Sequence, residues 1–288
     1  MNGPAVELIV VPWDSGRRGW RMGAGPLHLA GRVHSRLEAL GLDVHEVTID
    51  PSEMSDGDPA SAFAIAADVA RRVAHARSGR RFPIVLAGNC STALGTVAGM
   101  GAGSTGVVWF DAHGDFNTPH TSPSGFLDGM SLAMLTGRCC TSDTARVPGF
   151  HALTDDAIVL AGARDLDDGE RRLIETSGVR VVAPGSVVSE QLAAAAEGWP
   201  PAVTEAYLHV DLDVLDPEEA IANAFAARGG IGLTDLLACI DAVATHVPIG
   251  AAALTALDPE ADVDGRATAA ALAVVEQILA RADYGGPA

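Results

Sequence analysis

The sequence predicts a single three-layer α/β/α domain in which helices cover both faces of a mostly parallel central sheet. Two observations support this fold class. Short apolar runs alternate with longer helical patterns along all 288 residues, and no linker, repeat or low-complexity segment interrupts them. Such alternation builds parallel strands joined by crossover helices. The strand runs are also nearly continuously apolar, as expected when both faces of a sheet are covered.

Eight strands are expected, because eight short runs are β-rich and apolar. They are residues 6–11, 43–49, 82–87, 106–111, 157–161, 179–182, 206–210 and 250–256. The longer segments between them carry helical patterns. These are residues 27–40, 60–76, 91–100, 128–135, 167–177, 185–196, 234–245 and 266–282. In such a sheet ligands bind beyond the carboxyl ends of the strands, so the loops that follow the strands are expected to carry the site.

The charge of the chain argues against several classes of partner. A formal net charge of −18 is unfavourable for binding nucleic acid or an anionic membrane. The same charge is compatible with a small cationic substrate. All 19 basic residues are arginine, and the absence of lysine excludes Schiff-base chemistry and a Walker A phosphate loop.

Cysteine usage and the N-terminus predict a cytoplasmic protein. The four cysteines, Cys90, Cys139, Cys140 and Cys239, do not fit a secreted disulfide framework in a chain of this length. The N-terminus has no basic region, and the apolar run at residues 6–11 is too short for a signal core or a membrane span.

Two acidic clusters follow predicted strands and indicate a metal site. Asp111, His113 and Asp115 come directly after one strand, and Asp211 and Asp213 follow another. Side chains of extended backbone alternate between faces, so Asp111 and His113 share a face. Charged groups are seldom buried unpaired, which makes packing a poor explanation for such clusters. The alternative, a helix-capping loop and a solvated strand end, requires two coincidences.

The donor types favour manganese over structural zinc. Oxygen-rich sites with one or two nitrogen donors suit Mn²⁺, whereas structural zinc sites show pairs of cysteine and histidine. The two clusters supply four carboxylates, more than one divalent ion needs. Two ions that share bridging carboxylates would use all of them, and a pair of ions ~3.5–4 Å apart can stabilise both ends of a hydrolytic displacement.

Three longer motifs contain or accompany these clusters. They read D-A-H-G-D-F-N-T-P at residues 111–119, G-A-R-D-L-D at residues 162–167 and D-L-D-V-L-D-P at residues 211–217. On these motifs the chain resembles the ureohydrolase superfamily (arginase, agmatinase, formimidoylglutamase and relatives), from the loop at residues 21–26 to Pro259. The resemblance implies an arginase-like fold, a binuclear manganese centre and a small-molecule substrate. Family members are often trimers or hexamers, so it also implies a homo-oligomer.

The resemblance assigns a role to each predicted metal ligand. Asp111 and Asp211 resemble the carboxylates that bridge the two metal ions. Asp115 resembles a ligand of the first ion, while His113 and Asp213 resemble ligands of the second.

One ligand position departs from the family pattern. The remaining ligand of the first ion is normally the histidine of a G-G-D-H-S motif, but residues 88–91 read G-N-C-S, so Cys90 replaces it. As a thiolate, Cys90 would coordinate and favour a softer ion such as Zn²⁺. As a neutral thiol it would leave the first ion weakly held by carboxylates alone, and as a small buried hydrophobe it would have no role in binding. We favour ligation or close approach.

The substrate side resembles that of arginases. Asn117 and Ser124 match residues that bind the amino-acid head of the substrate, Asp167 matches the residue that meets its α-ammonium, and Glu170 matches an acidic position of the same rim. This pattern favours a substrate with an amino-acid head. The alternative is that residues 117–119 form only a turn, as their composition allows.

Two positions near the reacting group also depart from arginases. Asp128 matches the proton-shuttle histidine, and Ala256 matches the glutamate that pairs with the guanidinium. Asp258 would lie on the same strand face as Ala256 if the backbone stays extended, and could then partly compensate. An exposed carboxyl group with a pKa of about 4 is a poorer shuttle at neutral pH than imidazole.

These departures disfavour plain L-arginine and favour a less basic guanidine. The predicted reaction is hydrolysis of Nω-hydroxy-L-arginine to ornithine and hydroxyurea, and the chain resembles the hydroxyarginine hydrolases of antibiotic biosynthesis. Arginase, agmatinase or formimidoylglutamase activity remains an alternative. A rival from another class is a metal-poor ureohydrolase-like protein that binds a ligand without catalysis.

Overall fold

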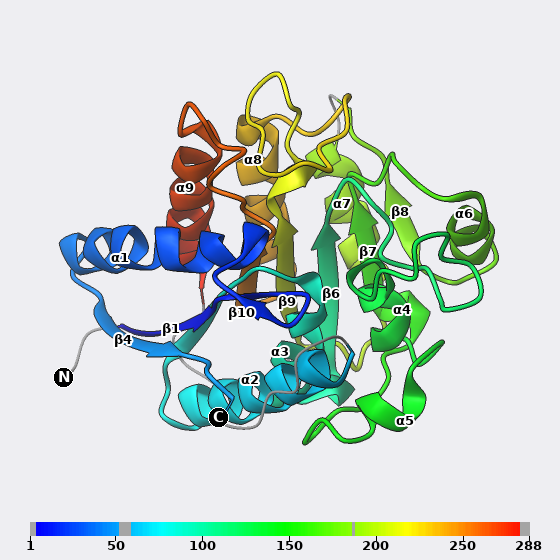
Figure 1. Ribbon diagram of the computed structural model, residues 1–288, viewed down its shortest axis with the longest axis horizontal. Helices are drawn as coiled ribbons and strands as arrows, with labels where there is room; N and C mark the ends of the chain where they lie inside the picture. Colours follow the sequence, from blue (N-terminus) through cyan, green and yellow to red (C-terminus); the bar gives the residue numbers. More distant parts are fainter. Residues whose placement is uncertain (1–3, 52–58, 186–187, 283–288) are drawn as a thin grey trace.

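The centre of the protein is an eight-stranded sheet in which every neighbouring pair of strands is parallel (Figure 1). The computed structural model describes residues 4–51, 59–185 and 188–282. In spatial order the strands are β4 (Asp43–Thr48), β1 (Ala5–Val11), β5 (Phe82–Ala87), β10 (Ile249–Thr255), β9 (Glu205–Asp211), β6 (Thr105–Phe110), β7 (Ile158–Ala161) and β8 (Arg180–Val182). The sequence prediction of a parallel α/β sheet is confirmed.

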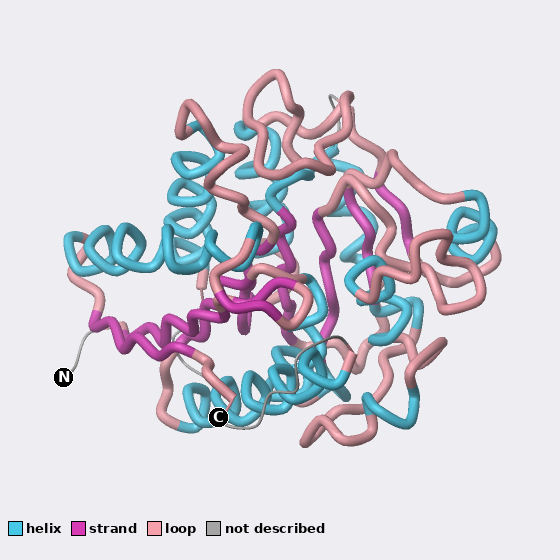
Figure 2. Tube along the Cα trace, in the orientation of Figure 1, coloured by secondary structure: helices cyan, strands magenta, loops and turns pink. Residues whose placement is uncertain are grey.

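Helices cover both faces of the sheet, as Figure 2 shows by colour. One face packs against α1 (Ala24–Ala39), α7 (Val188–Glu197), α8 (Leu233–Ala244) and α9 (Arg266–Arg281). The other packs against α2 (Ala60–Ser78), α3 (Ala93–Met100), α4 (Ser131–Leu135) and α6 (Asp168–Glu175). In β1, Leu8 and Val10 join the first core while Ile9 and Val11 join the second, as the period of two in a strand requires.

The sequence prediction recovers the eight strands but misses short elements. A hairpin of β2 (Trp13–Asp14) and β3 (Arg17–Arg18) lies next to the sheet ends, and α5 (Thr141–Thr144) follows α4. The hairpin turns at Ser15 and Gly16, whose φ angles of 50° and 75° are those of the two-residue turn that suits a hairpin. The start of the helix predicted at 185–196 lies partly outside the described residues.

The order of the strands places the site. The chain passes from β5 to β6 across two positions that β10 and β9 later fill, so these four strands lie side by side in the middle of the sheet. Their carboxyl ends therefore meet where ligands bind in open parallel sheets. Within the described part of the chain, no helix is long and apolar enough to cross a bilayer.

Candidate active site

A cavity of about 250 Å³ opens over the carboxyl ends of these central strands. The structure brings every predicted site residue except Asp258 to its wall. These are Cys90, Asp111, His113, Asp115, Asn117, Ser124, Asp128, Asp167, Glu170, Asp211 and Asp213. Residues separated by more than 120 positions in the chain thus share one small space, because parallel strands deliver their ends to one edge.

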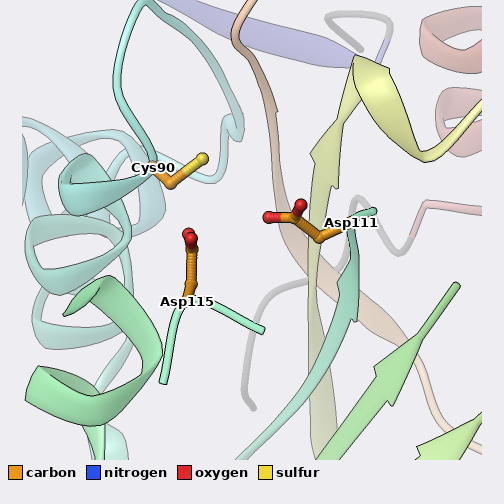
Figure 3. Close-up of side chains that lie close together, drawn as sticks. All are labelled: Cys90, Asp111 and Asp115. Carbon is orange, nitrogen blue, oxygen red and sulfur yellow. The ribbon is translucent and has the colours of Figure 1, made fainter. Parts of the chain in front are cut away.

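The first group of possible metal ligands comprises Cys90, Asp111 and Asp115. One ligand atom from each lies within 4.8 Å of the other two, and Figure 3 shows the three side chains pointing toward a common centre. All three are buried. Asp115 reaches this centre through a backbone φ of 49°, a left-handed conformation that non-glycine residues adopt at some cost. The strain is consistent with a functional constraint.

The second group comprises Asp111, His113 and Asp213, and it shares Asp111 with the first. His113 Nδ1 lies 3.2 Å from Asp111 Oδ1 and 3.4 Å from Asp213 Oδ2. Burial alone would lower the pKa of His113, but the hydrogen bond and charge of Asp111, with the charge of Asp213, raise it to about 9. A shared carboxylate between two ligand groups is the arrangement that a bridged pair of ions needs.

Asp211 lies between the two groups at the end of β9. Its Oδ1 accepts a hydrogen bond from the backbone N–H of Asp213 at 2.9 Å, which starts the turn η6 (Leu212–Val214). Its Oδ2 accepts the thiol hydrogen of Cys90, with the sulfur 3.1 Å away. The same carboxylate therefore contacts residues of both groups.

The electrostatics of these carboxylates fit two bound cations. Burial, then the charge of Asp111, raises the pKa of Asp115 well above its usual value, and burial with the charges of Asp213 and Asp111 does the same for Asp211. Asp115 Oδ2 is buried and has no hydrogen-bond partner. Buried carboxylates this close are costly unless a cation neutralises them. The oxygen-rich donor set, with one imidazole and one sulfur, suits divalent transition ions.

Cys90 is placed by a tight backbone packing. Gly88 precedes it at the end of β5, and a Cβ there would overlap the backbone of Trp13 and Gly23. The chain then enters the turn η2 (Cys90–Thr92). Burial, then the charge of Asp211, raises the pKa of the Cys90 thiol well above its usual value, so the sulfur can serve as a thiolate only when a cation offsets that cost.

Asp128 differs from the sequence expectation of an exposed carboxyl group. It is 8% exposed, and both of its oxygens accept N–H hydrogen bonds: Oδ1 from the Ser91 backbone and Oδ2 from the Asn89 side chain, each at 2.9 Å. Burial raises its pKa to about 6 although these hydrogen bonds oppose the shift. A carboxyl group with this pKa exchanges protons near neutral pH far more readily than one at 4.

The residues predicted to surround the amino-acid head of the substrate all line the cavity. Asn117 Nδ2 donates to Asp167 Oδ2 at 2.9 Å, which joins the two residues expected to hold the amino-acid head. Glu170 Oε1 accepts from the Phe116 backbone at 2.8 Å, and burial raises the pKa of Glu170 to about 7. Ser124 is exposed at the mouth of the cavity.

The expectation that Asp258 compensates for Ala256 is wrong. Strand β10 ends at Thr255, and Ala256 has a φ of 63°, so the backbone does not stay extended. Asp258 consequently leaves the strand face, and its Oδ1 accepts from the Glu260 backbone at 3.0 Å instead of lining the cavity. Ala256 itself lines the cavity.

Sequence reasoning missed two residues that hold the site. Asn223 Nδ2 lies 3.3 Å from Asp213 Oδ2 and 2.9 Å from the Ala256 carbonyl, and it has no motif around it. Arg164 lies inside the G-A-R-D-L-D motif, so its structural role could have been suspected from the sequence. Its guanidinium donates to the backbone carbonyls of Gly162, Asp213, Val214, Leu215 and Ala227.

The fold and the paired ligand groups define a binuclear metal hydrolase of the ureohydrolase type. The model for the Arginase family matches residues 4–280, and the chain belongs to that family of metal-dependent amidine and guanidine hydrolases.

Several known proteins are similar to this chain. It is 31% identical to an arginase of Bacillus caldovelox, covering 95% of this chain and 97% of that one. It is 32% identical to an N(omega)-hydroxy-L-arginine amidinohydrolase of Streptomyces lavendulae, with 96% and 97% covered. The crystal structure of an arginase from Bacillus subtilis superposes with a TM-score of 0.84 at 28% identity, covering 96% of this chain and 98% of that chain.

Proposed function

We propose that the protein hydrolyses Nω-hydroxy-L-arginine to L-ornithine and hydroxyurea. The observation that carries the proposal is that the two ligand groups and Ala256 line one cavity. Because residue 256 is alanine, no carboxylate stands at the position that pairs with a basic guanidinium in arginases. A hydroxyguanidine is less basic, so it needs that pairing less. The relative from S. lavendulae, which is named for this activity, supports the proposal. Its sequence identity to this chain, 32%, is close to the 31% of the B. caldovelox arginase.

Two divalent ions would occupy the two ligand groups. Cys90, Asp115, Asp111 and Asp211 would hold the first ion, and His113 and Asp213, with the shared Asp111 and Asp211, would hold the second. We propose Mn²⁺ at both, with Zn²⁺ or another softer ion as the alternative at the sulfur-containing site. When bound, the ions would activate water for attack on the guanidine carbon and stabilise the charge that develops there.

The protein's own residues would then orient the substrate and move a proton. Asn117, Ser124 and Asp167 would bind the carboxylate and ammonium of the amino-acid head, with Glu170 beside them. Asp128 would give a proton to the nitrogen that leaves with ornithine as the carbon–nitrogen bond breaks. Its raised pKa of about 6 keeps a useful protonated fraction near neutral pH.

The test is a substrate panel with metal content measured on the same sample. Hydroxyarginine, arginine, agmatine and formimidoylglutamate are incubated with protein loaded with Mn²⁺, and ornithine, urea and hydroxyurea are quantified. We expect hydroxyarginine to have the highest kcat/KM, by at least about tenfold over arginine. Turnover of another member at a higher kcat/KM would replace the substrate. No turnover with two ions bound would contradict the proposal, and no bound metal would favour the non-catalytic rival.

A further inference from the structure

A chain of buried polar side chains lies behind Cys90, on the side away from the cavity. The Cys90 sulfur lies 3.3 Å from Thr255 Oγ1 on β10. Thr255 Oγ1 is in turn 3.3 Å from His209 Nε2 on β9. His209 Nδ1 lies 2.9 Å from the Tyr207 hydroxyl. His209 and Tyr207 are fully buried and Thr255 nearly so, and the three lie outside the lining of the cavity.

The same histidine supports the other side of the first ligand group. The His209 ring stacks on Trp109 with 3.6 Å between ring centroids and an interplanar angle of 11°. Trp109 Nε1 donates to Asp111 Oδ2 at 3.1 Å. His209 therefore contacts Trp109, which binds Asp111, and it also contacts Thr255, which meets Cys90.

His209 is a buried polar residue in the middle of a strand. Its neighbours in β9, Leu208 and Val210, are apolar and fully buried, as strand residues covered on both faces usually are. A buried polar side chain is costly unless it is hydrogen-bonded. Both ring nitrogens of His209 meet hydroxyl groups, and one of these, that of Thr255, also contacts the Cys90 sulfur.

The hydrogen bonds can run in one direction along this chain. If Tyr207 donates to Nδ1, the neutral imidazole carries its hydrogen on Nε2 and donates to Thr255 Oγ1. The Thr255 hydroxyl can then donate to the Cys90 sulfur at 3.3 Å, which is nearer than its other acceptor, the Val210 carbonyl at 3.5 Å. A cysteine that binds a metal ion gives up its thiol proton, so Cys90 would then no longer donate a hydrogen bond to Asp211. Thr255 remains as the hydrogen-bond donor to the sulfur.

We propose that His209 is a positioning residue that acts through Thr255 to orient Cys90 and to stabilise its sulfur as a ligand of the first metal ion. The inference rests on the metal centre of the proposed function, and it adds a residue behind that centre. Partners of this kind, which contact a ligand and not the ion, typically change metal affinity by about 10–100-fold when they are removed.

The experiment is a titration of the metal-free protein with Co²⁺, without substrate. Coordination of Co²⁺ by a cysteine sulfur gives a sulfur-to-cobalt charge-transfer absorption in the near ultraviolet, which Cys90→Ser should abolish. Thr255→Val removes the hydroxyl group at nearly constant volume. We expect it to weaken Co²⁺ binding at the sulfur-containing site by about tenfold and to shift the absorption, while binding at the His113 site stays unchanged.

Two further variants separate positioning from packing. Thr255→Ser keeps the hydroxyl group and should retain the wild-type absorption and affinity. His209→Phe keeps a ring for Trp109 to stack on and removes both nitrogens, so it should behave like Thr255→Val. Far-ultraviolet circular dichroism and thermal unfolding verify that each variant is folded. If His209→Phe does not fold, the comparison of Thr255→Val with Thr255→Ser tests the proposal.

Two outcomes would overturn the proposal. One is an absence of the charge-transfer absorption in the wild-type protein loaded with Co²⁺, because Cys90 would then not be a ligand. The other is an identical affinity and absorption in folded Thr255→Val or in folded His209→Phe. Neither depends on turnover, so a failure of the proposed hydrolysis in the substrate panel remains a separate result.

Discussion

The side-chain amide of Asn89 donates a hydrogen bond to Asp128 Oδ2 at 2.9 Å, and this pair occupies two positions where the chain departs from the usual arginase motifs. The amide favours the charged form of the carboxyl group and opposes the effect of burial. Asp128 is therefore held in one orientation beside the ligand groups, with a pKa that suits proton transfer.

Asp128→Asn should lower kcat by about 100-fold with unchanged metal content, because the general acid is lost while the side-chain volume is kept and one of the two accepted N–H hydrogen bonds remains. Steady-state kinetics with the preferred substrate and elemental analysis provide the measurement. Asn89→Leu removes the hydrogen bond to Asp128 while the carboxyl group stays, and it also removes the one that Asn89 Oδ1 accepts from the Ser15 backbone. It should cause a smaller loss of kcat, of about tenfold. Full kcat in Asp128→Asn would remove this residue from the mechanism.

Cys90→His should raise the Mn²⁺ content toward two ions per chain. Imidazole is a harder donor than sulfur and needs to lose no proton at neutral pH, whereas the buried Cys90 thiol must. Calorimetric titration should show at least about tenfold tighter Mn²⁺ binding at the first site. Cys140→Ser, remote from the cavity lining, is the control and should bind like the wild type. Unchanged Mn²⁺ affinity in Cys90→His would show that the cysteine does not limit this site.

Ala256→Glu should shift specificity toward L-arginine. Ala256 lines the cavity, so a carboxylate there would meet the guanidinium of a basic substrate. We expect kcat/KM for arginine to rise by about tenfold while that for hydroxyarginine changes by less than about threefold. Ala256→Gln has nearly the same shape without the charge and should not produce the shift. An equal change for both substrates, or none, would argue that guanidinium pairing does not set specificity.

Asp115→Asn should stabilise the metal-free protein and weaken its metal binding. The pKa of Asp115 is raised in the folded chain, so its charge costs stability at every pH above the unfolded value of about 3.9 and the cost fades at lower pH. Thermal and urea unfolding at pH 7 should show a gain of roughly 1–3 kcal/mol, since Oδ2 has no hydrogen-bond partner.

The gain from Asp115→Asn should shrink as the pH falls from 7 to 4 and disappear when both forms are protonated. Glu175→Gln removes an exposed carboxylate and should leave the free energy of unfolding nearly unchanged. A less stable metal-free Asp115→Asn would mean that the carboxylate is not a strained, uncompensated charge in this fold.

Much of the fold could be read from the sequence, because apolar runs buried on both faces have few other interpretations. The carboxyl ends of parallel strands also meet at one edge of the sheet, which is why Asp111 and Asp211, 100 positions apart in the sequence, could be assigned to one site and both line the cavity. The failures arose where backbone direction changes at a single residue. The left-handed Ala256 turned Asp258 away from the strand face, and no local pattern announces that conformation in an alanine.

The environment of Asp128 was missed for a different reason. Its burial depends on the loop that carries Asn89 and Ser91, which reaches it from another strand. The polar character of His209 was visible in the sequence, but its partners Thr255 and Trp109 come from neighbouring strands. Such contacts depend on the register between strands, and a single sequence does not specify that register.

The five carbonyl groups that Arg164 gathers also bear on how substrate enters. They tie the segment after β9 to residue 227, two positions beyond the cavity-lining Phe225. A segment fixed by so many hydrogen bonds to one half-buried guanidinium cannot move without breaking them together. The neighbouring loop at residues 122–126 is held by a few exposed hydroxyl contacts and by the stacking of Phe126 on Phe225, with 6.3 Å between ring centroids. Any widening of the cavity mouth should therefore come from movement of residues 122–126, while the segment held by Arg164 stays in place.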